Sequence, residues 1–68
     1  MKRSILTNRE QEIFTLLVAG KTTREIAKRL KISEKTVRNH ISNAIQKLEV
    51  KGRASAVVEL LKLGEITL

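Results

Sequence analysis

The chain has 68 residues, with 14 lysines and arginines against 7 acidic residues, which gives it a net charge of +7 at pH 7. A chain this short forms at most one domain, over residues 1–68, whose thin core leaves no room for the cleft of a multidomain enzyme. It has no cysteine, one histidine and apolar runs of at most four residues, which excludes disulfides, the usual zinc sites and a membrane span. We therefore expect a cytoplasmic protein with no metal and no cofactor.

Two helix starts of the same kind stand near the N-terminus. Thr7-Asn8-Arg9-Glu10 fits a capping box and is followed by apolar residues at helical spacing, which predicts a helix over about 8–19 that Gly20 can end. Thr22-Thr23-Arg24-Glu25 repeats the pattern and predicts a second, shorter helix near 23–30.

The second half of the chain contains two further helix patterns. Ser33 is a favourable N-cap for a helix over about 34–48, and Gly52 precedes an apolar segment that predicts a helix over about 53–63. A short helix, a turn with one apolar residue (Ile32) and a longer helix form the helix-turn-helix pattern. We expect an all-α fold of four helices.

The basic excess lies in the middle of the chain, where residues 21–53 hold ten basic and three acidic residues. The helix expected over 34–48 has apolar residues on one side and polar residues on the other, and it has no acidic residue after Glu34. Amides, hydroxyls and cations suit base edges and phosphates in a major groove. Because Phe14 is the only aromatic residue, duplex DNA is favoured over stacked single strands.

Several motifs carry a resemblance to a known family: Leu6-Thr7-Asn8-Arg9-Glu10, Gly20, Glu25-Ile26-Ala27, Ile32-Ser33, Thr36-Val37, His40, Lys47-Leu48 and Arg53. On these residues the chain resembles the LuxR-type helix-turn-helix family from Leu6 to Gly64. The stretches 32–44 and 56–61 are similar to those of a stand-alone member that regulates late spore-coat genes. One departure is Glu49, where the family usually has glycine, so this helix end must adopt a left-handed conformation or close differently.

The resemblance implies a four-helix domain whose third helix reads the major groove. Bases would be contacted by Arg38, Asn39 and Ser42. Phosphates would be contacted by Thr22, Thr23, Lys35, Thr36 and Lys47, and also by His40, unless its ring packs beside the helix near 23–30.

The resemblance also implies a symmetric dimer through the fourth helix, and its composition agrees, because seven of the ten residues 54–63 are apolar. One face against a thin core cannot bury them all. Val57 and Leu61 can pack inward together with Ala54 and Leu60, although Leu60 is also counted among the interface residues. We assign Ala56, Val58, Leu60 and Leu63 to the dimer interface. The alternative is that Ile66 and Leu68 fold back and cover this surface.

These observations favour a dimeric, sequence-specific regulator of transcription that binds double-stranded DNA, with sporulation or spore-coat genes as targets and RNA polymerase as a further partner. The alternative is a small adaptor that presents the apolar helix 53–63 to another protein. A membrane-surface helix fits poorly, because the basic residues are spread over two helices and tryptophan is absent. An enzyme fits least, since one histidine offers no paired nucleophile and base.

Overall fold

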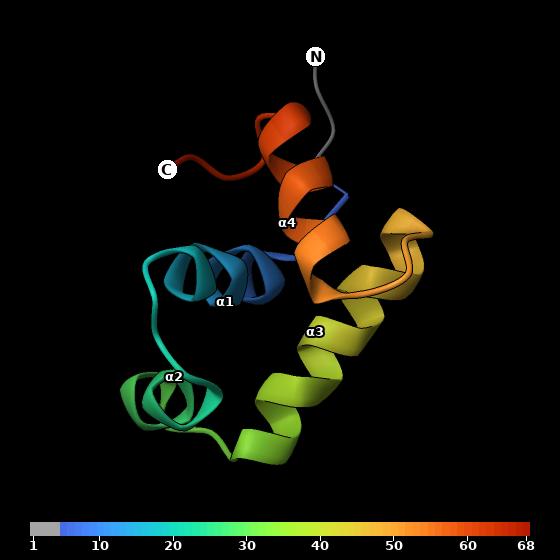
Figure 1. Cartoon of the computed structure of the whole chain (residues 1–68). Helices are drawn as coiled ribbons and strands as arrows, with labels where there is room; N and C mark the ends of the chain where they lie inside the picture. Colours follow the sequence, from blue (N-terminus) through green and yellow to red (C-terminus); the bar gives the residue numbers. More distant parts are fainter. Residues whose placement is uncertain (1–4) are drawn as a thin grey trace.

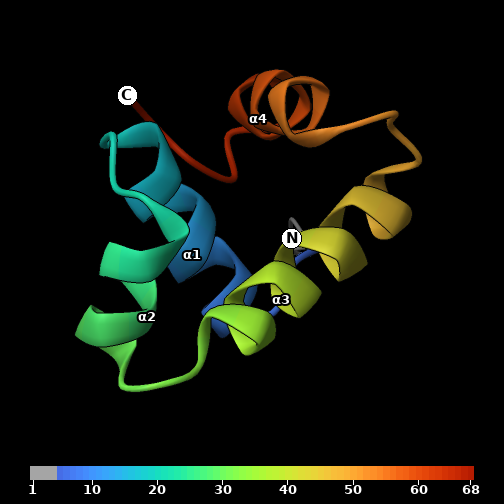
Figure 2. The same ribbon diagram turned by 60° about the horizontal axis from the view of Figure 1, so that its bottom comes forward.

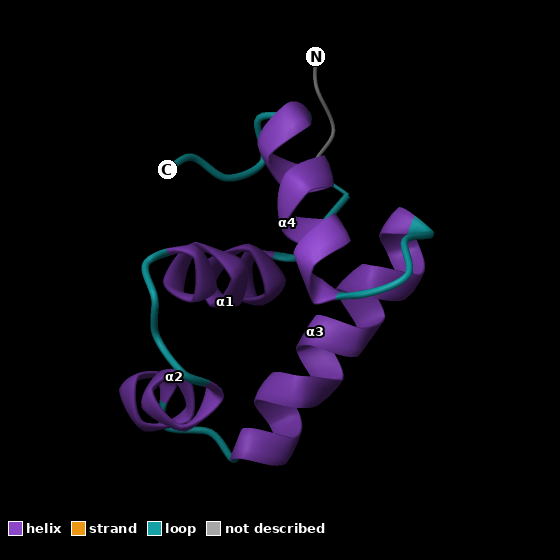
Figure 3. Cartoon of the chain, viewed as in Figure 1, coloured by secondary structure: helices purple, strands orange, loops and turns teal. Residues whose placement is uncertain are grey.

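The computed structural model describes residues 5–68, which form four helices and, within this range, no strand (Figure 3). The helices are α1 (Asn8–Val18), α2 (Thr23–Leu30), α3 (Glu34–Leu48) and α4 (Arg53–Lys62). The expected all-α fold is confirmed, and α2 and α3 have the predicted bounds. The helices α1 and α4 each end one residue earlier than predicted. Residues 1–4, which the expected domain includes, lie outside the described residues.

Capping boxes begin α1 and α2, as the sequence predicts. Thr7 Oγ1 accepts a hydrogen bond from the Glu10 amide at 3.1 Å, and the Thr7 amide donates to Glu10 Oε1 at 2.9 Å. Thr22 and Glu25 make the same two bonds with the same lengths. Each box satisfies two amides that a helix start leaves without a backbone partner. The first turns of both helices are therefore fixed by residues three apart in the chain.

Left-handed residues follow all four helices, and only two of them are glycines. Gly20 follows α1 with φ +92°, and Gly64 follows α4 with φ +73°. Lys31 ends α2 with φ +60°, and Glu49 ends α3 with φ +55°. Of the two alternatives for Glu49, the chain thus adopts the left-handed one, which costs a residue with a Cβ about 1 to 2 kcal/mol.

The core lies where α3 meets the other helices. Helix α3 packs against α1, α2 and α4, while α1 lies between α2 and α4 (Figures 1 and 2). Every helix contributes to the set of large, fully buried side chains, which are Ile13, Phe14, Ile26, Val37 and Leu60. The turn residue Ile32 is partly buried against this core, as predicted. Because α3 is held on one side by three helices, its opposite side is presented as a firm outer face.

The segment after α4 partly covers the core. Gln11 Nε2 on α1 donates to the carbonyl oxygen of Glu65 at 2.6 Å, and Ile66 is 4% exposed. Leu68, in contrast, is 95% exposed. Of the two residues expected in the alternative reading to fold back, only Ile66 packs into the core.

The assignment of Ala56 and Leu60 to a dimer interface is wrong. Both side chains are completely buried within the chain, because residues four apart lie on one helix face and this face of α4 points into the core. The expectation that Ala54 packs inward is wrong as well, since it is exposed. Val58 is 50% exposed and Leu63 is half-buried, so these two keep part of their surface.

Within residues 5–68, Glu10 is the one buried charged residue, with 3% of its side chain exposed. Its Oε1 accepts from Lys47 Nζ on α3 at 2.7 Å, in addition to the Thr7 amide. Burial alone would raise the pKa of Glu10, but the hydrogen bonds from Lys47 and Thr7 outweigh it and hold this pKa below its ordinary value. The ion pair fastens the start of α1 to the last turn of α3.

Lys47→Ala is expected to lower the free energy of unfolding by about 1 to 3 kcal/mol, because the Glu10 carboxylate stays buried without its ammonium partner. Denaturant unfolding followed by circular dichroism measures this. A lowered pKa in the folded state gives stability above the unfolded pKa that is lost as pH falls through the folded value, so the difference between the two proteins should shrink from pH 7 to about pH 3.

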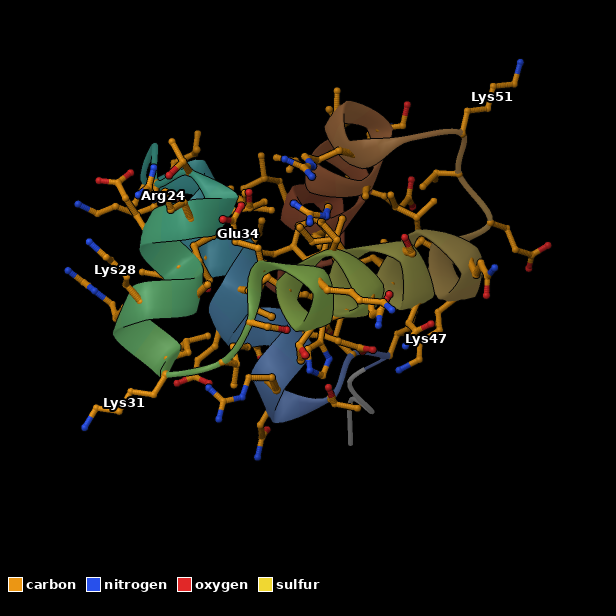
Figure 4. All side chains as sticks on the ribbon, turned by 90° about the horizontal axis from the view of Figure 1, so that it is seen from below. Arg24, Lys28, Lys31, Glu34, Lys47 and Lys51 are labelled. Carbon is orange, nitrogen blue, oxygen red and sulfur yellow. The ribbon has the colours of Figure 1, made fainter. Side chains whose placement is uncertain are left out.

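The control is Lys51→Ala, which removes an exposed lysine that points away from the helices in the loop between α3 and α4 (Figure 4). It should unfold like the unchanged chain. Equal stability of Lys47→Ala and the unchanged chain at pH 7 would contradict the structural role of the pair.

Glu49→Gly is expected to stabilise the fold by about 0.5 to 1 kcal/mol, because glycine adopts the left-handed conformation at this helix end without strain. The matched substitution is Ala19→Gly at the end of α1, where φ is −75° and glycine relieves nothing. It should destabilise. The melting temperatures of the two variants should therefore move in opposite directions, and a fall for Glu49→Gly would refute the strain.

Candidate nucleic-acid interface

The three residues predicted to read bases lie together on the outer face of α3. Arg38, Asn39 and Ser42 are all exposed. The opposite face consists of Val37, Ile41 and Ala44, each at most 3% exposed. The structure thus separates a buried side from a polar side along the same helix. The polar side, with Arg38, Asn39 and Ser42, carries hydrogen-bonding groups suited to base edges and is called the reading face below.

Around the start of α3, the predicted phosphate contacts are only partly free. Ser33 Oγ accepts from the Thr36 amide at 3.0 Å and lies 2.9 Å from the Thr36 hydroxyl, so Thr36 belongs to the helix cap. Lys35 is exposed and belongs to none of the ion pairs within residues 5–68. Of the five expected phosphate-binding lysines and threonines, Lys35 is therefore the cation best placed to meet DNA.

The start of α2 presents two more of the predicted phosphate contacts. Thr22 is exposed, and its hydroxyl accepts from the Glu25 amide. The amide of Thr22 and its hydroxyl hold the pKa of the Glu25 carboxyl below its ordinary value. Thr23, the first residue of α2, is half-buried.

Basic side chains gather on α2, beside the start of α3 (Figure 4). Arg24, Lys28 and Lys31 point outward from α2, and Lys47 lies near the far end of α3 (Figure 4). Cations at the edges of a groove-reading helix are placed where the two phosphate backbones pass. The cations of α2 are therefore placed to meet phosphates on one side of α3.

Lys47 has a partner that sequence reasoning missed. It was predicted to contact a phosphate, but its ammonium is bonded to Glu10 at 2.7 Å and the side chain is 38% exposed. The two residues lie 37 positions apart, so no local spacing signals the pair. Lys47 is a structural residue in this chain, and its proposed phosphate contact would compete with the ion pair.

His40 lies on the α1 side of α3. It is half-buried and lines an open hollow with Thr7 and Glu10 of the first capping box and with Asn43 and Lys47 of α3. The residues around it in this hollow thus come from α1 and α3, whereas the alternative reading placed its ring beside α2.

Glu34 and Arg38 form an ion pair on the polar side of α3. Glu34 Oε1 and Arg38 Nη1 are 3.5 Å apart, and their side chains are 44% and 57% exposed. The two residues are four positions apart, which is the usual spacing for such a pair on a helix. Arg38, which is expected to read bases, is therefore paired with an acidic residue when no DNA is bound.

Known proteins resemble this chain over most of its length. Residues 4–60 match the family model for bacterial regulatory proteins of the luxR family. The chain is 68% identical over 66 residues to spore germination protein GerE of Bacillus subtilis (strain 168), which covers 97% of this chain and 89% of that protein. It is 52% identical over 60 residues to transcriptional regulatory protein DegU of Brevibacillus brevis, 88% of this chain but only 25% of that protein.

The fold agrees with a solved structure as well. The structure of the transcription factor GerE superposes with a TM-score of 0.93 at 65% identity, covering 96% of this chain and 97% of that one. The helix order, the capped starts of α1 and α2 and the family match over most of the residues lead to one assignment. The chain belongs to the luxR family of bacterial regulatory proteins, as its motifs predict.

Proposed function

We propose that this protein regulates transcription by binding specific sequences in double-stranded DNA, with α3 in the major groove. The observation that carries the proposal is the outer face of α3, where Arg38, Asn39 and Ser42 are exposed together opposite the buried side. Arginine pairs with guanine, asparagine with adenine, and serine with either. The family membership supports the same function.

Affinity would come mainly from phosphates. Lys35 lies in the first turn of α3, and the hydroxyls at the start of α2 and the basic side chains of α2 belong to the neighbouring helix (Figure 4 labels Arg24, Lys28 and Lys31). If about eight phosphates are neutralised by two copies, the logarithm of the binding constant should fall with the logarithm of salt concentration at a slope near −7. Thr22, Thr23, Lys35 and Thr36 remain proposed contacts, while Lys47 and His40 would contribute less because they face α1.

Binding as a dimer is the second part of the proposal. Val58 exposes half of its side chain on α4, next to an open groove lined by Val50, Ala54, Glu59 and Lys62. Two copies that pack these surfaces together would bury the exposed apolar residue that one copy leaves in water. Val58 and Leu63 are thus the remaining members of the proposed interface.

The proposed setting follows from the relatives. Identity of 68% to a protein named for spore germination supports a role in genes of spore formation. A cytoplasmic location and a contact with RNA polymerase complete the proposal. No helix within residues 5–68 has the length and apolar character needed to cross a membrane. We expect no catalytic activity, since its relatives are named as regulators and a transcription factor.

Arg38→Ala tests the reading face. Duplexes selected from a random pool by the unchanged chain should share a motif, and the variant should bind this motif about 1 to 3 kcal/mol more weakly while losing preference at one base pair. Lys35→Ala should instead weaken binding to all sequences alike and reduce the salt slope by about 1. Fluorescence anisotropy titrations at several salt concentrations measure both. Normal discrimination by Arg38→Ala would remove Arg38 from the base contacts.

Val58→Asp tests the dimer. The selected motif should contain two inverted half-sites about 10 bp apart, and Val58→Asp should bind this duplex about tenfold more weakly, because two carboxylates would meet in an apolar interface. Binding to a single half-site should not change. Ile5→Asp, at a residue 44% exposed outside α4, is the matched control. An asymmetric motif, or equal binding of the two-half-site duplex by Val58→Asp, would contradict the dimer.

A further inference from the structure

Glu34 is the one acidic residue in α3, and it stands at the end of the helix nearest α2 (Figure 4). A carboxylate at this place is unfavourable for a DNA-binding helix, because phosphates repel it. Its charge does suit the positive end of the helix. That benefit is independent of Arg38, however, and an exposed pair four residues apart adds little to stability. The spacing explains why the contact with Arg38 forms, and its small effect on stability leaves room for a role in binding.

The geometry of the pair leaves most of the guanidinium available. Glu34 Oε1 lies 3.5 Å from Arg38 Nη1, and the Arg38 side chain is 57% exposed. A guanidinium has five N–H donors in a planar fork, so the remaining donors can still meet O6 and N7 of a guanine. A long side chain that is held before binding also loses less rotamer freedom on binding.

The same contact alters the charge that Arg38 presents. A carboxylate beside the guanidinium offsets its positive charge, which weakens its attraction to any phosphate. Hydrogen bonds to a base edge depend on donor geometry as well as on net charge, and they are affected less. The pair should thus disfavour sequence-independent contacts more than specific ones.

We propose that Glu34 is a positioning residue that holds Arg38 for a base edge and so sets the sequence preference of the protein. The proposal rests on the proposed function, since it needs Arg38 to read a base. It assigns Glu34 a role in specificity, which a purely structural role at the helix start would not produce.

The test concerns the base pair that Arg38 reads, which is the one whose preference is lost in Arg38→Ala. The penalty is the loss of affinity when this base pair is replaced by another. In Glu34→Gln this penalty should fall about three- to tenfold, the effect of releasing one ordered side chain, while binding to unrelated duplex DNA becomes tighter. Glu49→Gln is the matched control, because it removes one negative charge at the other end of α3 from a residue with no ion pair within residues 5–68. It should leave the penalty unchanged.

A double variant separates positioning from direct contact. In the Arg38→Ala background, Glu34→Gln should change no base preference, because there is no guanidinium left to hold. A further loss of preference in this background would overturn the proposal, since Glu34 would then contact DNA by itself. An unchanged penalty in Glu34→Gln, or equal effects of Glu34→Gln and Glu49→Gln, would also overturn it.

Thermal unfolding of each variant accompanies the titrations and identifies any loss of folded protein. If the unchanged chain prefers a base pair and Glu34→Gln keeps this preference in full, the role of Glu34 is refuted and the proposed function is not. Binding of the unchanged chain without any preferred base pair would refute the proposed function, and the role of Glu34 with it.

Discussion

The ion pair between Glu10 and Lys47 is the contact on which the arrangement of the helices depends. One carboxylate closes the first turn of α1 through Thr7 and at the same time binds the last turn of α3. An exposed ion pair is worth little, but a carboxylate that is 3% exposed makes the loss of its partner costly. Because α3 packs against all three other helices, its attachment to α1 fixes the frame in which the reading face points outward.

The division of α3 into two faces connects stability to binding. Val37, Ile41 and Ala44 are buried, so the helix cannot rotate or shift without opening the core. The backbone positions of Arg38 and Asn39, on the outer face, are thereby fixed before any DNA arrives. Conformational entropy that the chain loses on folding is not lost again on binding, which favours affinity and discrimination together.

Local signals explain what the sequence predicted well, and distant contacts explain what it missed. The capping boxes at Thr7 and Thr22 join residues three apart, so spacing alone predicts the helix starts. The role of Lys47 depends on Glu10, 37 residues earlier, and only the packing of α1 on α3 brings them together. For α4 the apolar residues were recognised, but nearly every side of the helix is apolar, so its pattern does not select which face enters the core.

The ion pair between Glu10 and Lys47 also affects which positive charges DNA would meet. A phosphate that took Lys47 would leave the buried Glu10 carboxylate with one partner fewer, so this contact opposes the fold. While the pair is intact, the two charges largely cancel at a distance. Arg24, Lys28, Lys31 and Lys35 are exposed and, within residues 5–68, have no ion-pair partner. These four cations place attraction to phosphates on α2 and the start of α3, the same end at which Glu34 meets Arg38, and we expect this end to enter the groove first.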